Sequence, residues 1–128
     1  MADKEVIRTE KAPAPFQGAP YSQAIASGGF VFVAGQLGWK PGETTFAEGI
    51  AEQTEIVFAN MGAILEEAGS GLDQLVKTTV FLQNLDDFAG MNEVYARHVG
   101  DRPPARATIE VAGLPSGALV EIEAVAHL

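Results

Sequence analysis

An α+β fold, with a mixed β-sheet and two helices on one of its faces, is the fold class that the sequence predicts. Two stretches have the apolar spacing of amphipathic helices, and strand-like segments precede, separate and follow them. The chain has 128 residues, of which 47% are hydrophobic, and this suits one globular domain with an ordinary core. We therefore expect residues 1–128 to form a single domain, built as a two-layer sandwich.

The two helices are expected at residues 46–68 and 86–99. In the first, apolar side chains recur at steps of three and four, and Gly69 follows them as the expected cap. The second is amphipathic in the same way and ends at Gly100. Its inner side is expected to carry Phe88, Met91, Val94 and Tyr95.

The other apolar and β-branched segments are expected to form strands at residues 6–9, 21–26, 30–34, 75–83, 106–112 and 119–127. Ser27, Gly28 and Gly29 predict a hairpin between the second and third strands. Because only residues 113–117 separate the last two strands, we expect them to be antiparallel neighbours. Strand alternation places Val76, Thr78, Val80 and Leu82 on one face of the fourth strand.

The last two strands each have an apolar side and a more polar side. In residues 119–127 the apolar side holds Val120, Ile122, Ala124 and Ala126, and Glu121 and Glu123 lie opposite. In residues 106–112, Ala107, Ile109 and Val111 are expected to face the helices, opposite Arg106, Thr108 and Glu110.

Residues 30–34 are apolar on both faces of their strand, so we expect both faces to be buried. Two helices on one side of a sheet cannot cover the other side. Self-association across the open face is the favoured explanation. The alternative is a central strand that a loop of the same chain covers.

The composition excludes several classes of function. The net charge is −9, and no run of Lys or Arg is present to neutralise phosphates, so neither nucleic acid nor an anionic membrane is an expected partner. The chain has no cysteine, and its two histidines lack metal-ligand spacing, so no metal site is expected. No signal peptide or membrane span is visible, and a cytoplasmic location is expected.

Arg106 and Glu121 are the candidate functional residues that the pattern itself indicates. Arg106 follows Pro103 and Pro104, which fix the entry to its strand, and arginine grips a carboxylate bidentately. Glu121 shares a strand face with Glu123, and two like charges there predict a cationic partner or a raised pKa. A structural cross-strand pair between an arginine and a glutamate is the alternative for both. For Tyr21 and Asn92, packing and simple exposure are the alternatives.

Several segments together resemble the RidA/YjgF family of small imine deaminases. The matching segments are 18–24 (GAPYSQA), 35–38 (GQLG), 76–82 (VKTTVFL), 86–88 (DDF) with Met91 and Asn92, 104–106 (PAR), 110–115 (EVAGLP) and 121–124 (EIEA). They occur in the order and spacing of that family. Each is short, and their joint occurrence is what makes the resemblance specific.

The resemblance implies a chorismate-mutase-like fold and a homotrimer whose sheets line an inner barrel, with sites in clefts between subunits. The implied activity is hydrolytic deamination of 2-aminoacrylate, 2-iminopropanoate and 2-iminobutanoate to 2-oxo acids and ammonia, a repair of metabolite damage that needs no cofactor. It implies that Arg106 binds the substrate carboxylate and that Glu121 holds the attacking water. Tyr21, the backbone at Gly35, Asn92 and Thr108 would complete the substrate site.

The chain departs from the usual family pattern at three positions. Ala34 precedes Gly35 where many relatives have serine, Ala107 follows the arginine where serine is common, and Thr108 replaces a cysteine or serine. These departures bear on the range of substrates. A non-catalytic module that binds a small carboxylate is the alternative function, and the net charge of −9 disfavours a ribonuclease or translation inhibitor.

Overall fold

The computed structural model of the protein describes residues 3–115 and 117–128. The described strands and α-helices are β1 (Glu5–Ile7), β2 (Ala24–Ser27), β3 (Phe30–Leu37), α1 (Ile50–Glu67), β4 (Leu75–Leu82), α2 (Phe88–Val99), β5 (Ala105–Glu110) and β6 (Val120–His127). Short 3-10 helices lie at Phe16–Gly18, Leu72–Gln74 and Leu85–Asp87.

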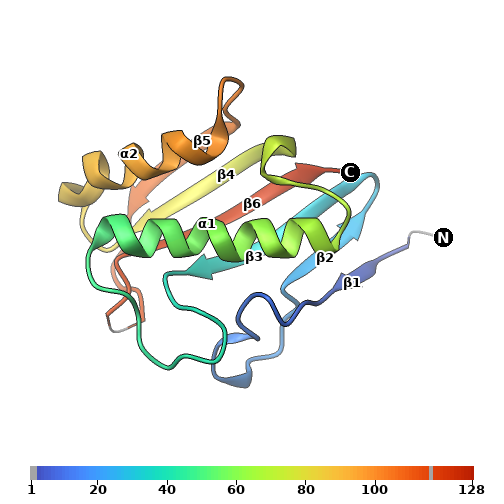
Figure 1. Ribbon diagram of the computed structural model, residues 1–128, viewed down its shortest axis with the longest axis horizontal. Coiled ribbons are helices and arrows are strands. Elements are labelled where there is room, and N and C mark those ends of the chain that lie inside the picture. The colour runs from blue at the N-terminus through green and yellow to red at the C-terminus, as the bar shows by residue number, and fades with distance from the viewer. Residues whose placement is uncertain (1–2, 116) are drawn as a thin grey trace.

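The strands form one six-stranded sheet in the order β1-β2-β3-β6-β4-β5, and both helices lie on the same face of it (Figure 1). Every neighbouring pair is antiparallel except β4 and β5, which are parallel. The prediction of an α+β fold with a mixed sheet and two helices on one face is therefore confirmed. The predicted hairpin between β2 and β3 is also present.

The core lies between the helices and the sheet. Helix α1 buries the apolar stripe that its spacing predicted, and β3, β4 and β6 supply the opposing side chains. Fully buried members include Val31, Phe58, Met61, Ile64, Leu65, Val80 and Ile122. The glycine after α1 is Gly69, with a φ of +84°, which is the left-handed conformation expected of a residue that ends a helix.

The predicted pairing of the last two strands is wrong. Strand β5 is an edge strand and pairs with β4, whereas β6 is inserted between β3 and β4. Helix α2 connects β4 to β5, and such a crossover produces a parallel pair. The short connection after β5 then crosses the end of β4, where Val111 N donates to Leu82 O and Gln83 N donates to Leu119 O.

The predicted orientation of β5 is wrong as well. Its parallel register places Arg106 beside Thr78, and Thr78 is fully buried under the helices. Arg106 and Thr108 therefore lie on the helix-covered face, while Ile109 points away from it and is 47% exposed. Alternation defines the two sides of a strand, and only the neighbouring strands decide which side meets the core.

Several boundaries and faces also differ from expectation. Helix α1 begins at Ile50 rather than at residue 46, and α2 begins at Phe88 after a turn of 3-10 helix. Phe88 is 41% exposed, so it does not belong to the inner side of α2. Val76 is also 41% exposed, because the register of β4 against β6 shifts between Leu75 and Lys77.

The sheet face away from the helices is only partly polar, and we call it the open face. In β3, Val31 and Val33 are buried under α1, but Phe30 and Phe32 on the other side are 41% and 48% exposed. No loop of the described chain covers them, which contradicts the loop alternative. Other residues on the open face are Ile25, Lys77, Thr79, Phe81, Ile109, Glu121, Glu123 and Val125.

Candidate functional site

Arg106 lies near the start of β5, against two aromatic rings of α2. Its guanidinium carbon is 4.7 Å from the centroid of the Tyr95 ring and 5.5 Å from that of Phe88. Within the described residues it forms no ion pair. Rings that pack on the face of a guanidinium leave its N–H groups at the edge free to donate. Arg106 is therefore held in place and able to receive an anion.

Two polar side chains, one on α2 and one on β5, each have a buried atom without a hydrogen-bond partner among the described residues. Asn92 lies between Phe88 and Tyr95 on one side of α2, and Thr108 follows Arg106 on one side of β5. Asn92 Oδ1 and Thr108 Oγ1 are both buried, and neither has a hydrogen-bond partner among the described residues. Unsatisfied buried polar atoms are uncommon and call for a missing partner. We call Asn92, Arg106 and Thr108 the arginine half-site.

Glu121 and Gly35 lie against each other on the open face. Gly35 stands where the register of β3 against β6 is irregular, between Val33 and Gln36. A Cβ on Gly35 would overlap Oε2 of Glu121 and would lie 2.8 Å from Cδ of that residue. The absence of a side chain at Gly35 thus makes the space in which the carboxylate rests.

The pKa of Glu121 is raised above its usual value. Burial is the larger cause, and the negative charge of Glu123 on the same face is the second. The sequence had indicated a raised pKa or a cationic partner for this pair, and the raised pKa is present. A carboxyl with a raised pKa is a better proton acceptor once it is ionised.

Tyr21 lines a small recess together with Gly35. The cavity there is about 20 Å³, and Phe16 and Trp39 form part of its wall. The Tyr21 hydroxyl accepts a hydrogen bond of 2.6 Å from Phe16 N, which fixes the ring although it is 44% exposed. We call Tyr21, Gly35 and Glu121 the glycine half-site.

The two half-sites lie on opposite faces of the sheet. Arg106 has Thr78 and, through β4, Ala124 as register neighbours on the helix-covered face. Glu121 is paired with Phe81 on the open face. One chain therefore does not bring Arg106 and Glu121 together, and the alternative of a cross-strand pair between them is contradicted. Glu110 bonds elsewhere, since its Oε1 accepts from Leu85 N at 2.8 Å.

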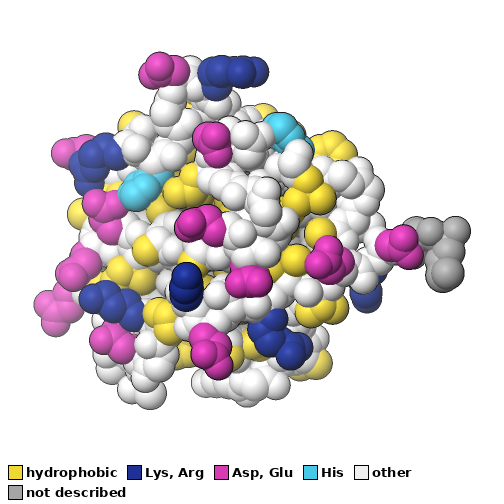
Figure 2. Space-filling model, turned by 45° about the vertical axis from the view of Figure 1, so that its right-hand side comes forward, with side chains coloured by type: hydrophobic (Ala, Val, Ile, Leu, Met, Phe, Trp, Pro, Cys, Tyr) yellow, Lys and Arg dark blue, Asp and Glu magenta, His cyan; other side chains and the backbone are white. Residues whose placement is uncertain are grey.

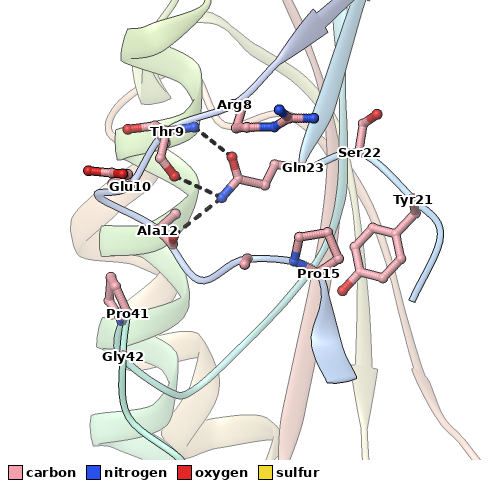
Figure 3. Close-up of a pocket in the computed structure, with 11 residues that line it drawn as sticks. Arg8, Thr9, Glu10, Ala12, Pro15, Tyr21, Ser22, Gln23, Pro41 and Gly42 are labelled. Carbon is pink, nitrogen blue, oxygen red and sulfur yellow. Dashed lines mark hydrogen bonds between the residues drawn. The ribbon is translucent and has the colours of Figure 1, made fainter. Parts of the chain in front are cut away.

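Tyr21 also lines a second and larger cavity, of about 440 Å³, between the segment that follows β1 and residues 21–23 (Figure 3). Gln23 holds this segment in place: its Oε1 accepts from Thr9 N, and its Nε2 donates to the carbonyl oxygens of Thr9, Ala12 and Pro13. Sequence reasoning did not identify Gln23. A buried glutamine beside a proline-rich loop, whose carbonyls need donors, is the signal that was available.

The aromatic pair Phe88 and Tyr95 was also missed as part of the site. Both residues were assigned to the core side of α2, but their rings contact Arg106. The heptad spacing between them is the signal, since it places both rings on one helix face. Their contact with β5 depends on strand order, which the sequence pattern predicted wrongly.

The three departures from the family pattern lie in different surroundings. Thr108 carries one of the unpaired buried atoms, whereas Ala107 points to the opposite side of β5 and is exposed. Ala34 precedes Gly35, and its backbone N donates to Gln23 O at 2.9 Å. Residue 34 is therefore next to the glycine half-site in the chain, and Thr108 is part of the arginine half-site.

Charge on the surface is mixed and mainly acidic. On the face shown in Figure 2, acidic side chains are spread over the surface, and the basic ones stand among them rather than in a patch. Within residues 3–115 and 117–128, no group of His, Asp or Glu is arranged to hold a metal ion. No helix in the described part of the chain is long and apolar enough to span a membrane.

Comparison with known proteins identifies many relatives. A RutC family protein of Pyrococcus abyssi is 53% identical over 125 residues, covering 97% of this chain and 97% of that protein. Reactive Intermediate Deaminase A of Arabidopsis thaliana is 47% identical and covers 98% of this chain and 66% of that protein. The human 2-iminobutanoate/2-iminopropanoate deaminase is 41% identical, covering 96% of this chain and 89% of that protein.

Solved structures agree with the sequence relatives. RidA from the Antarctic bacterium Psychrobacter sp. has a TM-score of 0.92 at 44% identity, covering 97% of this chain and 99% of that chain. TdcF of E. coli, solved with bound serine, has a TM-score of 0.88 at 33% identity and covers 97% of this chain and 98% of that chain. The family model described as endoribonuclease L-PSP matches residues 9–128. This chain therefore belongs to the endoribonuclease L-PSP family, the family of the RidA/YjgF proteins.

Proposed function

We propose that this protein hydrolyses small 2-imino acids and their enamine tautomers to 2-oxo acids and ammonia, at a site shared between two copies of the chain. One observation carries the proposal. One half-site has an arginine that forms no ion pair within the described residues, the other has a partly buried carboxyl, and the two lie on opposite faces of one sheet. The arginine half-site lacks a carboxyl, and the glycine half-site lacks a cation. Relatives that are named as deaminases support the choice of reaction.

In the proposed mechanism, Arg106 holds the substrate carboxylate through two N–H donors. Glu121 of a neighbouring copy, in its ionised form, accepts a hydrogen bond from a water and orients it toward the imine carbon. The water oxygen bonds to that carbon while Glu121 takes up the water's proton. Transfer of protons to nitrogen and cleavage of the C–N bond then leave a 2-oxo acid and ammonium.

The chemistry places modest demands on the protein. A protonated imine carbon is already electrophilic, so orientation of the two reactants and proton transfer can supply the acceleration. The unpaired Asn92 Oδ1 and Thr108 Oγ1 are available to a polar substrate atom beside Arg106. The substrate classes proposed are 2-aminoacrylate with 2-iminopropanoate, and 2-iminobutanoate.

We propose a homotrimer in which the open faces line a common interior. The exposed Phe30 and Phe32 support association, because soluble chains rarely leave adjoining aromatic residues uncovered. Strand β5 supports a shared cleft, since it is an edge strand and carries Arg106 to the boundary of the sheet. Association through the open face would also bring a second chain near each Glu121.

The test is formation of a 2-oxo acid from an imine produced in place by a serine or threonine dehydratase. The protein should speed the release of pyruvate or 2-oxobutanoate above the rate in buffer, and Arg106→Ala should remove most of that acceleration. Circular dichroism of each variant serves as the folding control. A folded wild-type protein without effect on the release would contradict the reaction, and a fully active Arg106→Ala variant would contradict the role of Arg106.

A module that binds a small carboxylate without converting it is the second candidate. The arginine half-site favours it, because this half-site is assembled within a single chain. Saturable binding of 2-oxobutanoate in calorimetry, together with inactivity on every imine, would select this candidate. RNA cleavage, which the description of the family model names, is not proposed, because the net charge of −9 opposes binding of a polyanion.

A further inference from the structure

The Tyr95 side chain is held in the core by contacts at its hydroxyl and at its ring. It is 5% exposed, and its hydroxyl forms a 2.6 Å hydrogen bond with Oγ1 of Thr78, a fully buried residue. Its ring packs edge-on against Phe58, with centroids 5.4 Å apart and planes at 79°. Both the tip and the side of the ring are therefore fixed, so the ring has one position.

The same ring forms the closer of the two aromatic contacts of Arg106. The guanidinium carbon is 4.7 Å from the Tyr95 centroid, and Phe88 at 5.5 Å adds a second, more exposed ring. A cation over a ring face is attracted by the ring's quadrupole, and a guanidinium also stacks on the ring through its flat side. The ring thus limits where the guanidinium can lie.

Thr78 links α2 to the sheet at the position of Arg106. It is the register partner of Arg106 in the parallel β4–β5 pair, and it also holds the tip of Tyr95. Thr78 therefore adjoins the backbone of Arg106 and also holds the ring that lies under the Arg106 guanidinium. A shift of α2 along the sheet would carry the Tyr95 ring with it, and the Thr78–Tyr95 hydrogen bond opposes such a shift.

We propose that Tyr95 is the positioning residue of the carboxylate anchor, and that its hydrogen bond to Thr78 fixes the plane in which Arg106 presents its donors. The inference rests on the proposed function, because it assumes that Arg106 binds the carboxylate. Tyr95 itself does not touch the substrate. A bidentate grip needs both oxygens in the plane of the guanidinium, so a tilted guanidinium loses one of its two bonds.

The test compares Tyr95→Phe, Thr78→Val and the double variant in the coupled imine assay. Each single variant removes the hydrogen bond between Thr78 and Tyr95 and leaves the remaining buried hydroxyl unpaired. We expect KM to rise by about threefold to tenfold, the range of a lost hydrogen bond or a weakened cation–π contact, with kcat nearly unchanged. The rise is expected mainly in KM because Arg106 is still present in these variants and still orients the bound substrate, but binds its carboxylate less tightly.

Thermal unfolding separates positioning from a purely structural role. In the double variant both hydrogen-bonding groups are replaced by apolar ones, so the unfolding midpoint should recover toward that of the wild type. Its KM should stay raised, because nothing then holds the tip of the ring. A double variant that recovers both the midpoint and KM would overturn the inference.

Thr54→Val is the matched control. Thr54 is fully buried, and its hydroxyl bonds to Ile50 O at 2.7 Å within α1. This variant should lower the unfolding midpoint without raising KM. If Tyr95→Phe and Thr78→Val change only the midpoint, as the control does, Tyr95 is a structural residue and the inference is wrong.

The design keeps this inference distinct from the proposed function. If Arg106→Ala matches the wild type in KM and kcat, the role of Arg106 fails and the inference fails with it. If Arg106→Ala loses activity but the Tyr95 and Thr78 variants keep their KM, only the positioning role fails. If the wild type turns over no imine, the dissociation constant for 2-oxobutanoate replaces KM in the same variants. Absence of such binding by the wild type would overturn both.

Discussion

At the scale of single residues, the glycine half-site depends on the lack of a side chain at Gly35. Gly35 has no Cβ, and the carboxylate of Glu121 occupies the space where one would stand. The φ angle of Gly35 is not positive, so a larger residue would meet a steric obstacle and no backbone strain. A substitution that adds a side chain at Gly35 would therefore displace the Glu121 carboxylate without removing it.

We predict that Gly35→Ala lowers kcat strongly, by about tenfold or more, while the unfolding midpoint changes little. The added methyl group displaces a side-chain end that can swing away, so the fold tolerates it, but the water loses its orientation. Steady-state kinetics and thermal unfolding check the prediction. Gly113→Ala is the control, because a Cβ at Gly113 would meet no atom of the described residues within 4 Å. Equal kcat in both variants would contradict the role of the Glu121 carboxylate.

A second prediction at this scale concerns pH. In the proposed mechanism Glu121 acts in its ionised form. Because its pKa is raised, kcat/KM should begin to fall at a higher pH than for a glutamate with the ordinary value of 4.5. Glu123→Gln removes the like charge, which lowers the pKa of Glu121 and moves the acidic limb to lower pH. Burial, the larger cause, remains, so the shift is partial. Glu66→Gln, on the exposed side of α1, should leave the limb in place.

At the scale of elements, the arginine half-site is set by how α2 sits against α1 and the sheet. Glu55 of α1 accepts a hydrogen bond from Arg97 Nη2 at 3.2 Å and is also bonded to Nε2 of His98, both on α2. The His98 ring stacks on Phe58, with centroids 4.7 Å apart. Phe58 in turn contacts Tyr95, so the outer link between the helices adjoins the residues beneath Arg106.

We predict that Glu55→Gln lowers stability modestly at neutral pH, by about 0.2–1 kcal/mol, because partly exposed ion pairs are screened by solvent. The pKa of Glu55 is lowered in the folded protein, chiefly by its hydrogen bond to His98 and then by that to Arg97. The stabilisation is therefore complete above the unfolded value of 4.5 and is lost as pH falls through the lower folded pKa. Chemical denaturation at neutral and acidic pH checks this, and a deficit that persists at acidic pH would contradict it.

The elements also show where sequence patterns were sufficient. Helix α1 was predicted because its apolar residues repeat with helical spacing, and a single packed face is enough to fix such a helix. The side of β5 was predicted wrongly. Arg106 and Ile109 occupy alternating positions, and an edge strand with few buried residues gives no strong hydrophobic bias to one side.

At the scale of the whole molecule, the proposed reaction requires a second chain, because one chain does not bring the two half-sites together. Residues 1–128 are proposed to form one domain. Within one chain, Arg106 and Glu121 lie on opposite faces of the sheet, on strands that β4 separates. The proposed assembly is therefore a condition of the proposed activity.

Mixing two inactive variants tests the shared site directly. Arg106→Ala and Glu121→Gln should each be inactive, and their co-assembled mixture should regain about a quarter of the wild-type activity, because random assembly pairs two intact halves in that share of the clefts. Coupled assay after co-expression measures it. No recovery in mixed oligomers confirmed by mass spectrometry would show that the site belongs to one chain.

A charge on the open face should weaken the assembly. Phe32 is 48% exposed in the single chain, and Phe32→Glu would place an unpaired carboxylate in the proposed interior. We expect a smaller species in sedimentation and loss of imine hydrolysis. Ala59→Glu adds the same side chain on the exposed side of α1 and should leave the oligomer intact. An unchanged sedimentation coefficient for Phe32→Glu would contradict the proposed interface.

The sequence by itself determined the fold class, the two helices, the six strands and the apolar character of both faces of β3, because these depend on local periodicity and composition. It also supplied the residues of both half-sites through a family resemblance. Only the tertiary structure decided that β6 lies between β3 and β4 and that Arg106 and Glu121 lie on opposite faces of the sheet. Strand order and facing arise from contacts between segments far apart in the chain, and a pattern within one strand carries no record of its neighbours.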